Sequence, residues 1–430
     1  MKAEPFSYRV YRALIDSARP IAHMMLLERS RRNKEDRTRL GERRGEATRS
    51  RPSGPLVWVH GASVGESLSL LPIIEALAAQ DYSVVVTSGT VTSAQVLAHR
   101  LPEGSTHQYM PLDVSSYVHR FLDHWRPDLA IFAESEIWPN MICQAHRRNI
   151  PLVLVNARMS PRSFRRWNQL RSLAHYLFTR FDLCLAQSQG DAERLVRLGA
   201  PRVTVTGNLK FDSVPPPASP AALASMNEFI GGRPVWLAAS THAGEELFAI
   251  DAHRRLTATY PDLLTIIAPR HPERGREIFA ATARAGLRGS QRSLGLQPDS
   301  ATDIYIADTI GEMGLFYRVA PIVFLGGSLV PHGGQNPIEP AKLGAALIHG
   351  PHIHNFTEVY AALEQAGGAY QINSADDLAA TLDHLIHDVA ARDDVAERGM
   401  NALTAIGGAL RRTMHEIAPY LLKMHLGNRP

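Results

Sequence analysis

Cysteine is almost absent from this sequence of 430 residues: Cys143 and Cys184 are the only two, and each lies inside an apolar segment. Two such cysteines form neither a disulfide framework nor a zinc knuckle, and their scarcity fits a reducing cytoplasm. The histidines give no metal motif, because no His-x-x-x-His pair is joined by a suitable carboxylate on a helix. We therefore expect no metal site and no bound cofactor.

Long apolar runs are also absent. Near the amino terminus, apolar side chains alternate with Arg9, Arg12, Asp16 and Arg19, so no stretch approaches the roughly 18 to 20 residues that cross a bilayer. Residues 29–51 then carry ten Lys or Arg against four acids. We favour an amphipathic interfacial helix and basic segment, residues 1–51, that binds an anionic membrane surface. A flexible Arg-rich arm with solvated charges is the alternative.

Short, β-branched apolar runs recur along the rest of the chain, and amphipathic helical stretches separate them. This alternation predicts an α/β fold with parallel sheets covered by helices. Residues 215–220, rich in proline, form a stiff spacer between two such series. The runs lie at 56–60, 83–86, 129–133, 152–155, 183–186 and 203–206 before the spacer, and at 235–239, 265–268, 304–307, 322–325 and 346–349 after it.

The sequence thus predicts two similar Rossmann-like domains, residues 52–214 and 215–410, followed by a helix within 411–430 that could pack on either half. Facing domains of this kind form a cleft between the carboxyl edges of their sheets, and such a cleft suits a reaction that joins two substrates.

Glu66 is the most prominent catalytic candidate. The segment 56–66, LVWVHGASVGE, reads as a strand, a turn with two glycines and a helix start, which places Glu66 at the carboxyl edge of a parallel sheet. The N–H groups of the helix terminus favour an ionised carboxylate, so Glu66 is a better candidate base than acid. A carboxylate that only caps its own helix is the alternative.

Polar clusters follow nearly every predicted strand and should converge on one crevice. They are Glu66, 134–136, 156–158 and 207–210 in the first half, and 240–242, 270–274, 308–312, 326–328 and 333–339 in the second. The glycine pairs at 326–327 and 333–334 could bring backbone N–H groups to a phosphate, or they are plain turns. Neither Gly-x-Gly-x-x-Gly nor the Walker pattern occurs at these loops, so a standard dinucleotide or ATP site is unsupported.

Two side chains of the second half suit a nucleotide. Arg270 offers a fork of donors to phosphate or carboxylate oxygens, and Pro269 and Pro272 rigidify its turn; simple surface solvation is the alternative. Glu339 follows Asn336-Pro337 at a helix head and could accept from the two hydroxyls of a ribose, or it caps its helix.

Six ordered stretches resemble the 3-deoxy-D-manno-octulosonic acid (Kdo) transferases of lipopolysaccharide assembly, a glycosyltransferase family of the GT-B type. They are ASVGE at 62–66, ESEIWPN at 134–140, NARMS at 156–160, TGNLKFD at 206–212, PRHPER at 269–274, and the glycine segment 326–339. The resemblance implies transfer of Kdo from CMP-Kdo to the lipid A precursor at the cytoplasmic face of the bacterial inner membrane, without a nucleic-acid partner.

The resemblance also implies roles for single residues. Glu66 would be the general base on the acceptor hydroxyl, and attack opposite the leaving nucleotide would invert the anomeric carbon. The acceptor would meet Glu134, Arg158 and Lys210. The donor would be held by Arg270, His271, Gly311, Glu312, Met313, Ser328, Asn336 and Glu339.

Two other functions compete with this one. Another two-domain sugar-nucleotide enzyme, a UDP-sugar transferase or epimerase, would share the glycine loops and the ribose-binding glutamate. A non-catalytic lipid-binding protein would use the Arg-rich segment and retain the fold. The amino-terminal segment is less apolar than the anchor common in the family, which favours peripheral attachment over a membrane span.

Overall fold

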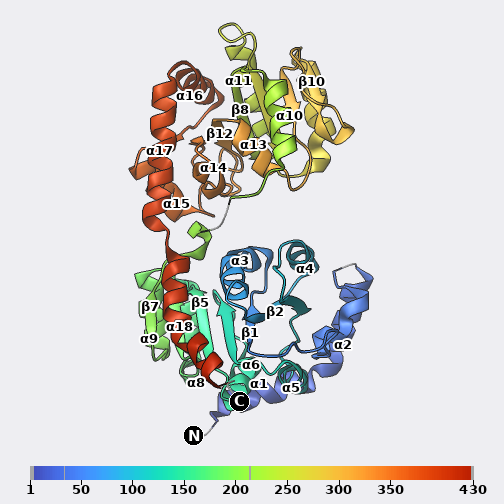
Figure 1. Cartoon of the computed structure of the whole chain (residues 1–430), viewed down its shortest axis with the longest axis vertical. Helices are drawn as coiled ribbons and strands as arrows, with labels where there is room; N and C mark the ends of the chain where they lie inside the picture. The colour runs from blue at the N-terminus through green and yellow to red at the C-terminus, as the bar shows by residue number, and fades with distance from the viewer. Residues whose placement is uncertain (1–3, 33, 213–214, 428–430) are drawn as a thin grey trace. The chain divides into compact units, whose positions relative to one another are not determined.

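A computed structural model describes residues 4–32, 34–212 and 215–427 (Figure 1). The chain divides into two compact units, Met1–Ser213 with Gly407–Pro430, and Val214–Ile406. Two of the expected boundaries differ from this division. Residues 1–51 are part of the first unit, and the last helix, α18 (Ala409–Gly427), belongs to that unit together with residues 407–410.

The first unit is built on a parallel sheet whose strand order is β3-β2-β1-β4-β5-β6-β7. Alternate residues of the inner strand β1 enter different cores: Trp58 packs with Phe121 and Phe132 on one face, and Val59 packs with Ile73 on the other. The strands are β1 (Leu56–His60), β2 (Ser83–Ser88), β3 (Ser105–Tyr109), β4 (Leu129–Ala133), β5 (Leu152–Ala157), β6 (Leu183–Ala186) and β7 (Val203–Val205).

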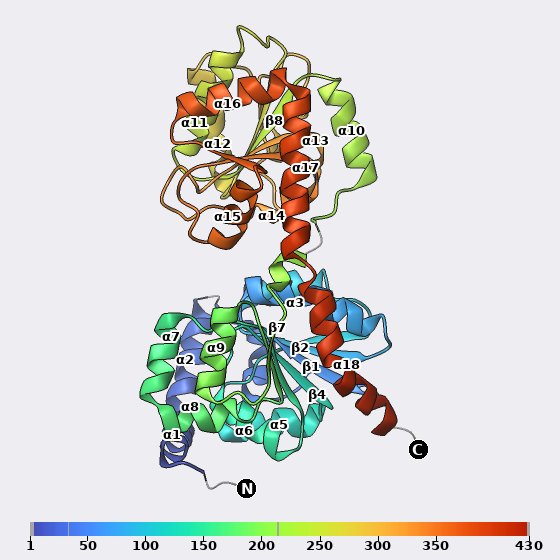
Figure 2. The ribbon, with the colours of Figure 1, turned by 90° about the vertical axis from the view of Figure 1, so that its left-hand side faces the viewer.

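Helices cover both faces of this sheet (Figures 1 and 2). The chain order begins with α1 (Phe6–Ser17), α2 (Arg19–Arg31) and the 3-10 segment η1 (Arg37–Arg44). The rest are α3 (Val64–Ala78), α4 (Val91–Ala98), α5 (Ser115–Trp125), α6 (Pro139–Arg147), α7 (Pro161–Gln169), α8 (Arg171–Phe178), α9 (Gln189–Leu198) and η2 (Leu209–Asp212).

Helix α18 packs on the first unit because it supplies apolar side chains to one of its cores. Ile417 and Leu421 are buried there, and Tyr82 donates its hydroxyl to the carbonyl of Leu421 at 3.0 Å. The carboxylate of Asp212 accepts the N–H groups of Gly408, at 2.6 Å, and Leu410 at the start of the helix. The start and the apolar side of α18 are thus both fixed by the first unit.

The second unit repeats the plan with the strand order β10-β11-β9-β8-β12-β13-β14, again all parallel. The strands are β8 (Val235–Thr241), β9 (Leu264–Pro269), β10 (Gly289–Gln291), β11 (Ile304–Ile306), β12 (Ile322–Leu325), β13 (Ala346–His349) and β14 (Ala369–Gln371). The helical segments are α10 (Pro220–Ile230), α11 (Glu245–Leu256), η3 (Pro272–Arg274), α12 (Gly275–Arg284), η4 (Arg292–Leu294), α13 (Met313–Val319), α14 (Ile338–Lys342), α15 (Thr357–Gln365), α16 (Ala375–His387) and α17 (Val389–Ile406).

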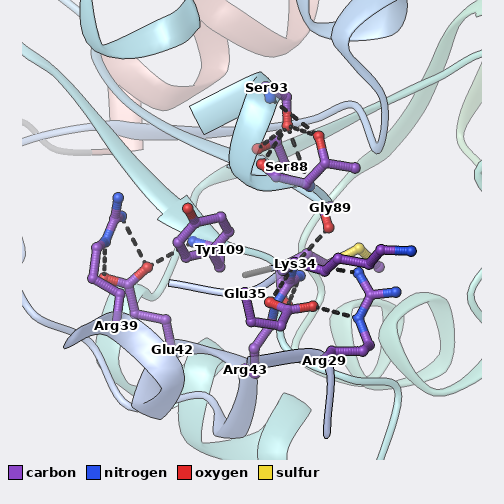
Figure 3. A network of polar contacts seen from close by, with 12 residues as sticks. Arg29, Lys34, Glu35, Arg39, Glu42, Arg43, Ser88, Gly89, Ser93 and Tyr109 are labelled. Atoms are coloured by element: carbon purple, nitrogen blue, oxygen red, sulfur yellow. Dashed lines mark hydrogen bonds and ion pairs between the residues drawn. The ribbon is translucent and has the colours of Figure 1, made fainter. Parts of the chain in front are cut away.

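The basic amino-terminal segment is mostly paired within the protein. Tyr8 of α1 is buried, and its ring lies 5.3 Å from that of Tyr176 in the neighbouring helix α8 (Figure 2). Arg39 and Glu42 of η1 form ion-paired hydrogen bonds of 2.9 Å (Figure 3). Each also bonds the backbone of the edge strand β3. Arg39 donates to the carbonyl of His107 at 2.8 Å, and the carboxylate of Glu42 accepts the N–H of Tyr109 at 2.7 Å.

Further ion pairs join Arg29 and Arg43 to Glu35, Arg44 to Glu46, and Arg51 to Asp128. Because these arginines are paired with acids of the protein, fewer of the positive charges in residues 29–51 are free for an anionic surface than their number indicates. Binding to such a surface stays a prediction. Within the described residues, we find no helix whose length and apolar character would let it cross a membrane.

Candidate functional site

Glu66 lies three residues after the cap of α3, at the carboxyl edge of the first sheet. Ser63 caps the helix by accepting the N–H of Glu66 at 3.3 Å. In return the Glu66 carboxylate accepts the N–H of Ala62 at 2.7 Å and the hydroxyl of Ser63 at 2.9 Å. Glu66 therefore does cap its helix. Because the side chain is only half-buried and a carboxylate has about four acceptor positions, this capping leaves acceptor capacity for a substrate proton.

A second carboxylate, Glu136, lies in the loop after the neighbouring strand β4. Its Oε2 accepts the indole N–H of Trp138 at 2.7 Å and lies 3.3 Å from Nε2 of His60. Burial alone would raise the pKa of Glu136, but the hydrogen bonds with His60 and Trp138 outweigh it and lower that pKa. His60 was not among the expected site residues. A histidine ending an apolar strand directly before the Gly61 turn was the available signal.

The three expected acceptor residues do come together. Nζ of Lys210 lies 3.1 Å from Oε1 of Glu134, and the N–H of Arg158 donates to the Glu134 carbonyl at 3.2 Å. Asn156 joins the same loops, since its Oδ1 accepts the N–H of Leu209 at 3.0 Å. Glu134 and Asn156 both adopt a left-handed backbone (φ 50°), which costs free energy in a residue with a side chain and is concentrated at functional sites.

The glycine loop of the second unit binds a carboxylate of the protein itself. Glu245, the first residue of α11, is 0% exposed. Its carboxylate accepts the N–H groups of Gly327 (2.7 Å), Ser328 (3.1 Å) and Leu329 (3.0 Å). It also accepts the N–H of His242 at 2.8 Å. The donors of residues 327–329 therefore face inward, which corrects the expectation of a phosphate cradle at this loop.

The next residue, Glu246, ties two further loops together. Its Oε1 accepts the hydroxyl of Thr241 at 3.1 Å and pairs with the guanidinium of Arg274. Of the two arginines in the segment 269–274, Arg274 is therefore structural. Arg270 and His271 are exposed at the end of β9, where they are accessible to a ligand.

Three histidines gather at the same edge of this sheet. The ring of His242 stacks on that of His332 with centroids 4.1 Å apart, and its centroid lies 5.9 Å from that of His271. The Gln335 amide lies 3.0 Å from Nε2 of His242. Gly327 has φ 67°, and a Cβ there would lie 3.2 Å from both His242 and Gln335. This glycine thus permits the close packing of the histidine and the amide.

The other residues expected to bind the sugar-nucleotide donor differ in burial and in their hydrogen-bond partners. Glu312 makes a two-point ion pair with Arg292, and this hydrogen bonding lowers the pKa of Glu312. Ser328 is fully buried, and its hydroxyl joins the Leu325 carbonyl to the N–H of Gly350.

Asn336 accepts the N–H of Ile338 at 3.0 Å, and Glu339 is half-buried at the start of α14. Gly311 is exposed with φ 88°, and Met313 begins α13. In residues 4–32, 34–212 and 215–427, no three His, Cys, Asp or Glu side chains are arranged to hold a metal ion.

Known proteins resemble the chain in sequence and in fold. Residues 38–213 match the family model described as 3-deoxy-D-manno-octulosonic-acid transferase (kdotransferase). A 3-deoxy-D-manno-octulosonic acid transferase from Haemophilus influenzae is 35% identical over 395 residues, covering 90% of this chain and 92% of the relative.

Solved structures share the fold at lower identity. A glycosyltransferase from Rickettsia africae is 14% identical with a TM-score of 0.58, covering 86% of this chain and 99% of that one. A UDP-GlcNAc 2-epimerase from Neisseria meningitidis is 15% identical with a TM-score of 0.56, covering 86% of this chain and 100% of that one. The two-unit architecture thus occurs in both transferases and epimerases, and the sequence relatives distinguish between them.

Proposed function

The chain belongs to the family of 3-deoxy-D-manno-octulosonic acid (Kdo) transferases, glycosyltransferases of lipopolysaccharide biosynthesis, and on that premise we propose a specific reaction for it. The enzyme moves Kdo from CMP-Kdo to the lipid A precursor, lipid IVA, with inversion at the anomeric carbon. The observation that carries this proposal is the half-buried Glu66 carboxylate, fixed by two local donors at the carboxyl edge of the first sheet.

Glu66 acts as the general base. Ala62 and Ser63 hold its carboxylate in one orientation, and a remaining lone pair accepts the proton of the acceptor hydroxyl. The hydroxyl oxygen forms a bond to the anomeric carbon of Kdo as the bond from that carbon to the CMP phosphate breaks. The electron pair of the broken bond leaves with the phosphate, and attack from the opposite face inverts the configuration.

The second unit binds the donor. Negative charge develops on the leaving phosphate, so cations and N–H donors stabilise the transition state. Because the N–H groups of 327–329 already bind Glu245, we assign this role to the exposed Arg270 and His271. Asn336 and Glu339 receive the ribose, and the segment 311–313 lies against the nucleotide. Ser328 contributes by joining the loops after β12 and β13.

The first unit binds the acceptor at the inner membrane. Lys210 and Arg158 meet acceptor phosphates, and Glu134 positions Lys210. Attachment is peripheral and rests on the apolar side chains that α1 and α2 expose, namely Phe6, Leu14 and Ile21. The basic segment adds less to this attachment than its composition indicates, because Arg29, Arg39 and Arg43 are paired inside the protein.

Mass spectrometry of a reaction with CMP-Kdo and tetra-acylated lipid A precursor tests the transfer, and NMR of the product gives its anomeric configuration. The expected product carries Kdo with inverted configuration. Retention of configuration would refute direct attack assisted by Glu66. CMP, and not UDP, should raise the temperature of thermal unfolding, whereas protection by UDP alone would favour a UDP-sugar enzyme.

A further inference from the structure

A cavity of about 330 Å³ lies in the first unit, between α2 and the loops at the carboxyl edge of the sheet. Its volume falls within the roughly 300–1,000 Å³ of small-molecule sites. Met25 and Leu26 of α2 line it, together with Met110, Leu112 and Trp138 from the loops after β3 and β4. Most of these side chains are apolar, so the cavity suits a hydrocarbon group better than a sugar or a nucleotide.

The three charged residues at this cavity, Arg29, Glu35 and Arg43, are hydrogen-bonded to one another through the single Glu35 carboxylate. Glu35, which is almost completely buried, accepts from Arg29 at 2.8 Å and from Arg43 at 3.0 Å (Figure 3). Arg43 also donates to the carbonyls of Gly89 at 2.6 Å and Met110 at 3.2 Å. These guanidinium groups therefore stabilise the wall of the cavity. Because they are already hydrogen-bonded within the protein, an apolar occupant does not have to desolvate an unpaired charge.

The cavity shares a wall with the proposed base. Ala62 lines the cavity, and its N–H donates to the Glu66 carboxylate at 2.7 Å. Gly89, another lining residue, donates its N–H to the Ala62 carbonyl at 2.9 Å. A Cβ at Gly89 would lie 2.7 Å from that carbonyl oxygen, so the close approach of the two loops requires glycine. A group held in the cavity is therefore next to Ala62, the residue whose N–H orients the Glu66 carboxylate.

We propose that this cavity binds one fatty acyl chain of the acceptor and thereby positions the acceptor hydroxyl at Glu66. The inference rests on the proposed function, because it takes the acceptor to be a lipid-linked sugar. Each methylene buried from water increases affinity about fourfold, so even a few carbons give a substantial gain. Seating a chain beside Ala62 also restricts the orientation of the attached sugar, which favours the reactive geometry.

Two neighbouring methionines of α2 allow a matched test. Met25 lines the cavity and is 59% exposed, whereas Met24 does not line it and is 62% exposed. Met25→Trp and Ala22→Trp narrow the cavity from the same helix, and Met24→Trp adds an equal indole to the surface outside it. Since Met24 and Met25 are both mostly exposed, we expect these proteins to fold, and thermal unfolding checks it.

The assay measures KM and kcat in detergent with the acylated precursor and with a fully deacylated one. We expect Met25→Trp and Ala22→Trp to raise KM for the acylated acceptor at least about tenfold while leaving kcat/KM for the deacylated acceptor unchanged. Met24→Trp should match the wild type with both acceptors. Equal losses for Met24→Trp and Met25→Trp would mean that α2 meets the lipid as a surface, and the pocket assignment would be wrong.

A binding measurement separates failure of the pocket from failure of the proposed reaction. A fatty acid brominated along its chain should quench the fluorescence of Trp138, and Trp138→Phe should remove that part of the quenching. If quenching occurs but no acceptor receives Kdo, the proposed transfer is wrong and the acyl pocket stands. If Kdo is transferred but the brominated chain leaves Trp138 unquenched, the pocket is wrong and the transfer stands.

Discussion

In both units a carboxylate lies at the start of the helix that follows the first strand, yet the two carboxylates have different surroundings. Glu66 follows β1 and is half-buried, and its carboxylate accepts from Ala62 and Ser63. Glu245 follows β8, is 0% exposed, and accepts four backbone N–H groups, three of them from residues 327–329. The same position in the fold therefore supplies a candidate base in one unit and a structural group in the other.

The difference arises from the loop that faces each helix start. In the second unit, the chain after β12 turns its N–H groups toward α11, and these donors stabilise a buried charge that would otherwise be costly. The Glu66 carboxylate accepts from the nearby Ala62 and Ser63, and its side chain keeps contact with solvent. The role of a carboxylate at this position, reactive or structural, thus depends on whether a loop distant in sequence offers it backbone N–H donors.

The largest expected effect comes from Glu245→Gln. Glutamine lacks the charge and presents an NH2 group to N–H donors, so the free energy of unfolding of the second unit should fall by about 3–5 kcal/mol. Urea denaturation, with hydrogen exchange to assign the loss to residues 214–406, measures it. Asp251→Asn on the same helix removes exposed ion pairs and should cost less than about 1 kcal/mol. Equally small losses of unfolding free energy in Glu245→Gln and Asp251→Asn would contradict the structural role of Glu245.

Glu66→Gln should lower the rate of Kdo transfer by roughly a hundredfold or more, the usual effect of losing a general base. Glutamine keeps a carbonyl oxygen for the N–H of Ala62, its NH2 group can donate to the Ser63 hydroxyl, and Ser63 still caps the helix, so the substitution separates the base from the cap. Unfolding temperature and CMP affinity should stay at wild-type values. Glu75→Gln, on the exposed side of the same helix, is the control and should transfer Kdo normally. Normal transfer by Glu66→Gln would leave Glu66 as a cap only.

Arg270→Ala should weaken nucleotide binding about tenfold to a hundredfold, because a hydrogen bond to a charged group is worth about 1.5–3 kcal/mol. Calorimetric titration with CMP measures the change. Arg276→Ala removes an exposed arginine of α12 and should bind CMP normally. Unchanged affinity in Arg270→Ala would place the phosphate elsewhere, and His242 would be the next group to replace.

The smallest effect concerns pH and a buried histidine of the second unit. Burial lowers the pKa of His253 to about 4, below the value of about 6.5 in the unfolded chain. The unfolded state therefore binds the proton first, and stability present above pH 6.5 is lost as the pH falls toward 4, by roughly 1 kcal/mol at pH 6. Hydrogen exchange of peptides from the second unit should show this fall in stability with decreasing pH, and His253→Gln should reduce it.

In the first unit, burial followed by the charges of Arg39 and Arg43 lowers the pKa of His107 to about 3. That unit should therefore also lose stability in acid, and the pH dependence of its stability should be unchanged in His253→Gln. Loss of the pH dependence of both units in this variant would mean that the two units do not unfold independently.

The interior of each sheet was predictable from sequence, and the edges were less so. Central strands such as β1, β4 and β12 are buried on both faces and read as continuous apolar runs. Three strands were missed, β3, β10 and β14, and all three lie at sheet edges. The β3 sequence STHQY has no apolar run, because a strand with one neighbour is only partly buried.

The candidate site was predictable where its contacts are local or follow adjacent strands. Glu66 at a helix start and the convergence of Glu134, Arg158 and Lys210 belong to this group. The role of Glu245 was not predictable, because three of its four donors lie 82 to 84 residues further along the chain. The pairing of the η1 arginines was not predictable for a related reason: composition counts charges, whereas pairing depends on which acids and carbonyls the fold brings near.

The sheet of the first unit ends at β3 against two side chains, since Arg39 binds the carbonyl of His107 and Glu42 binds the N–H of Tyr109. A chain shortened to begin at residue 52 would leave these backbone groups bare, and a bare edge recruits strands from other molecules. Such a protein should aggregate on purification, as light scattering would detect. Shortening the chain to improve solubility would then have the opposite result.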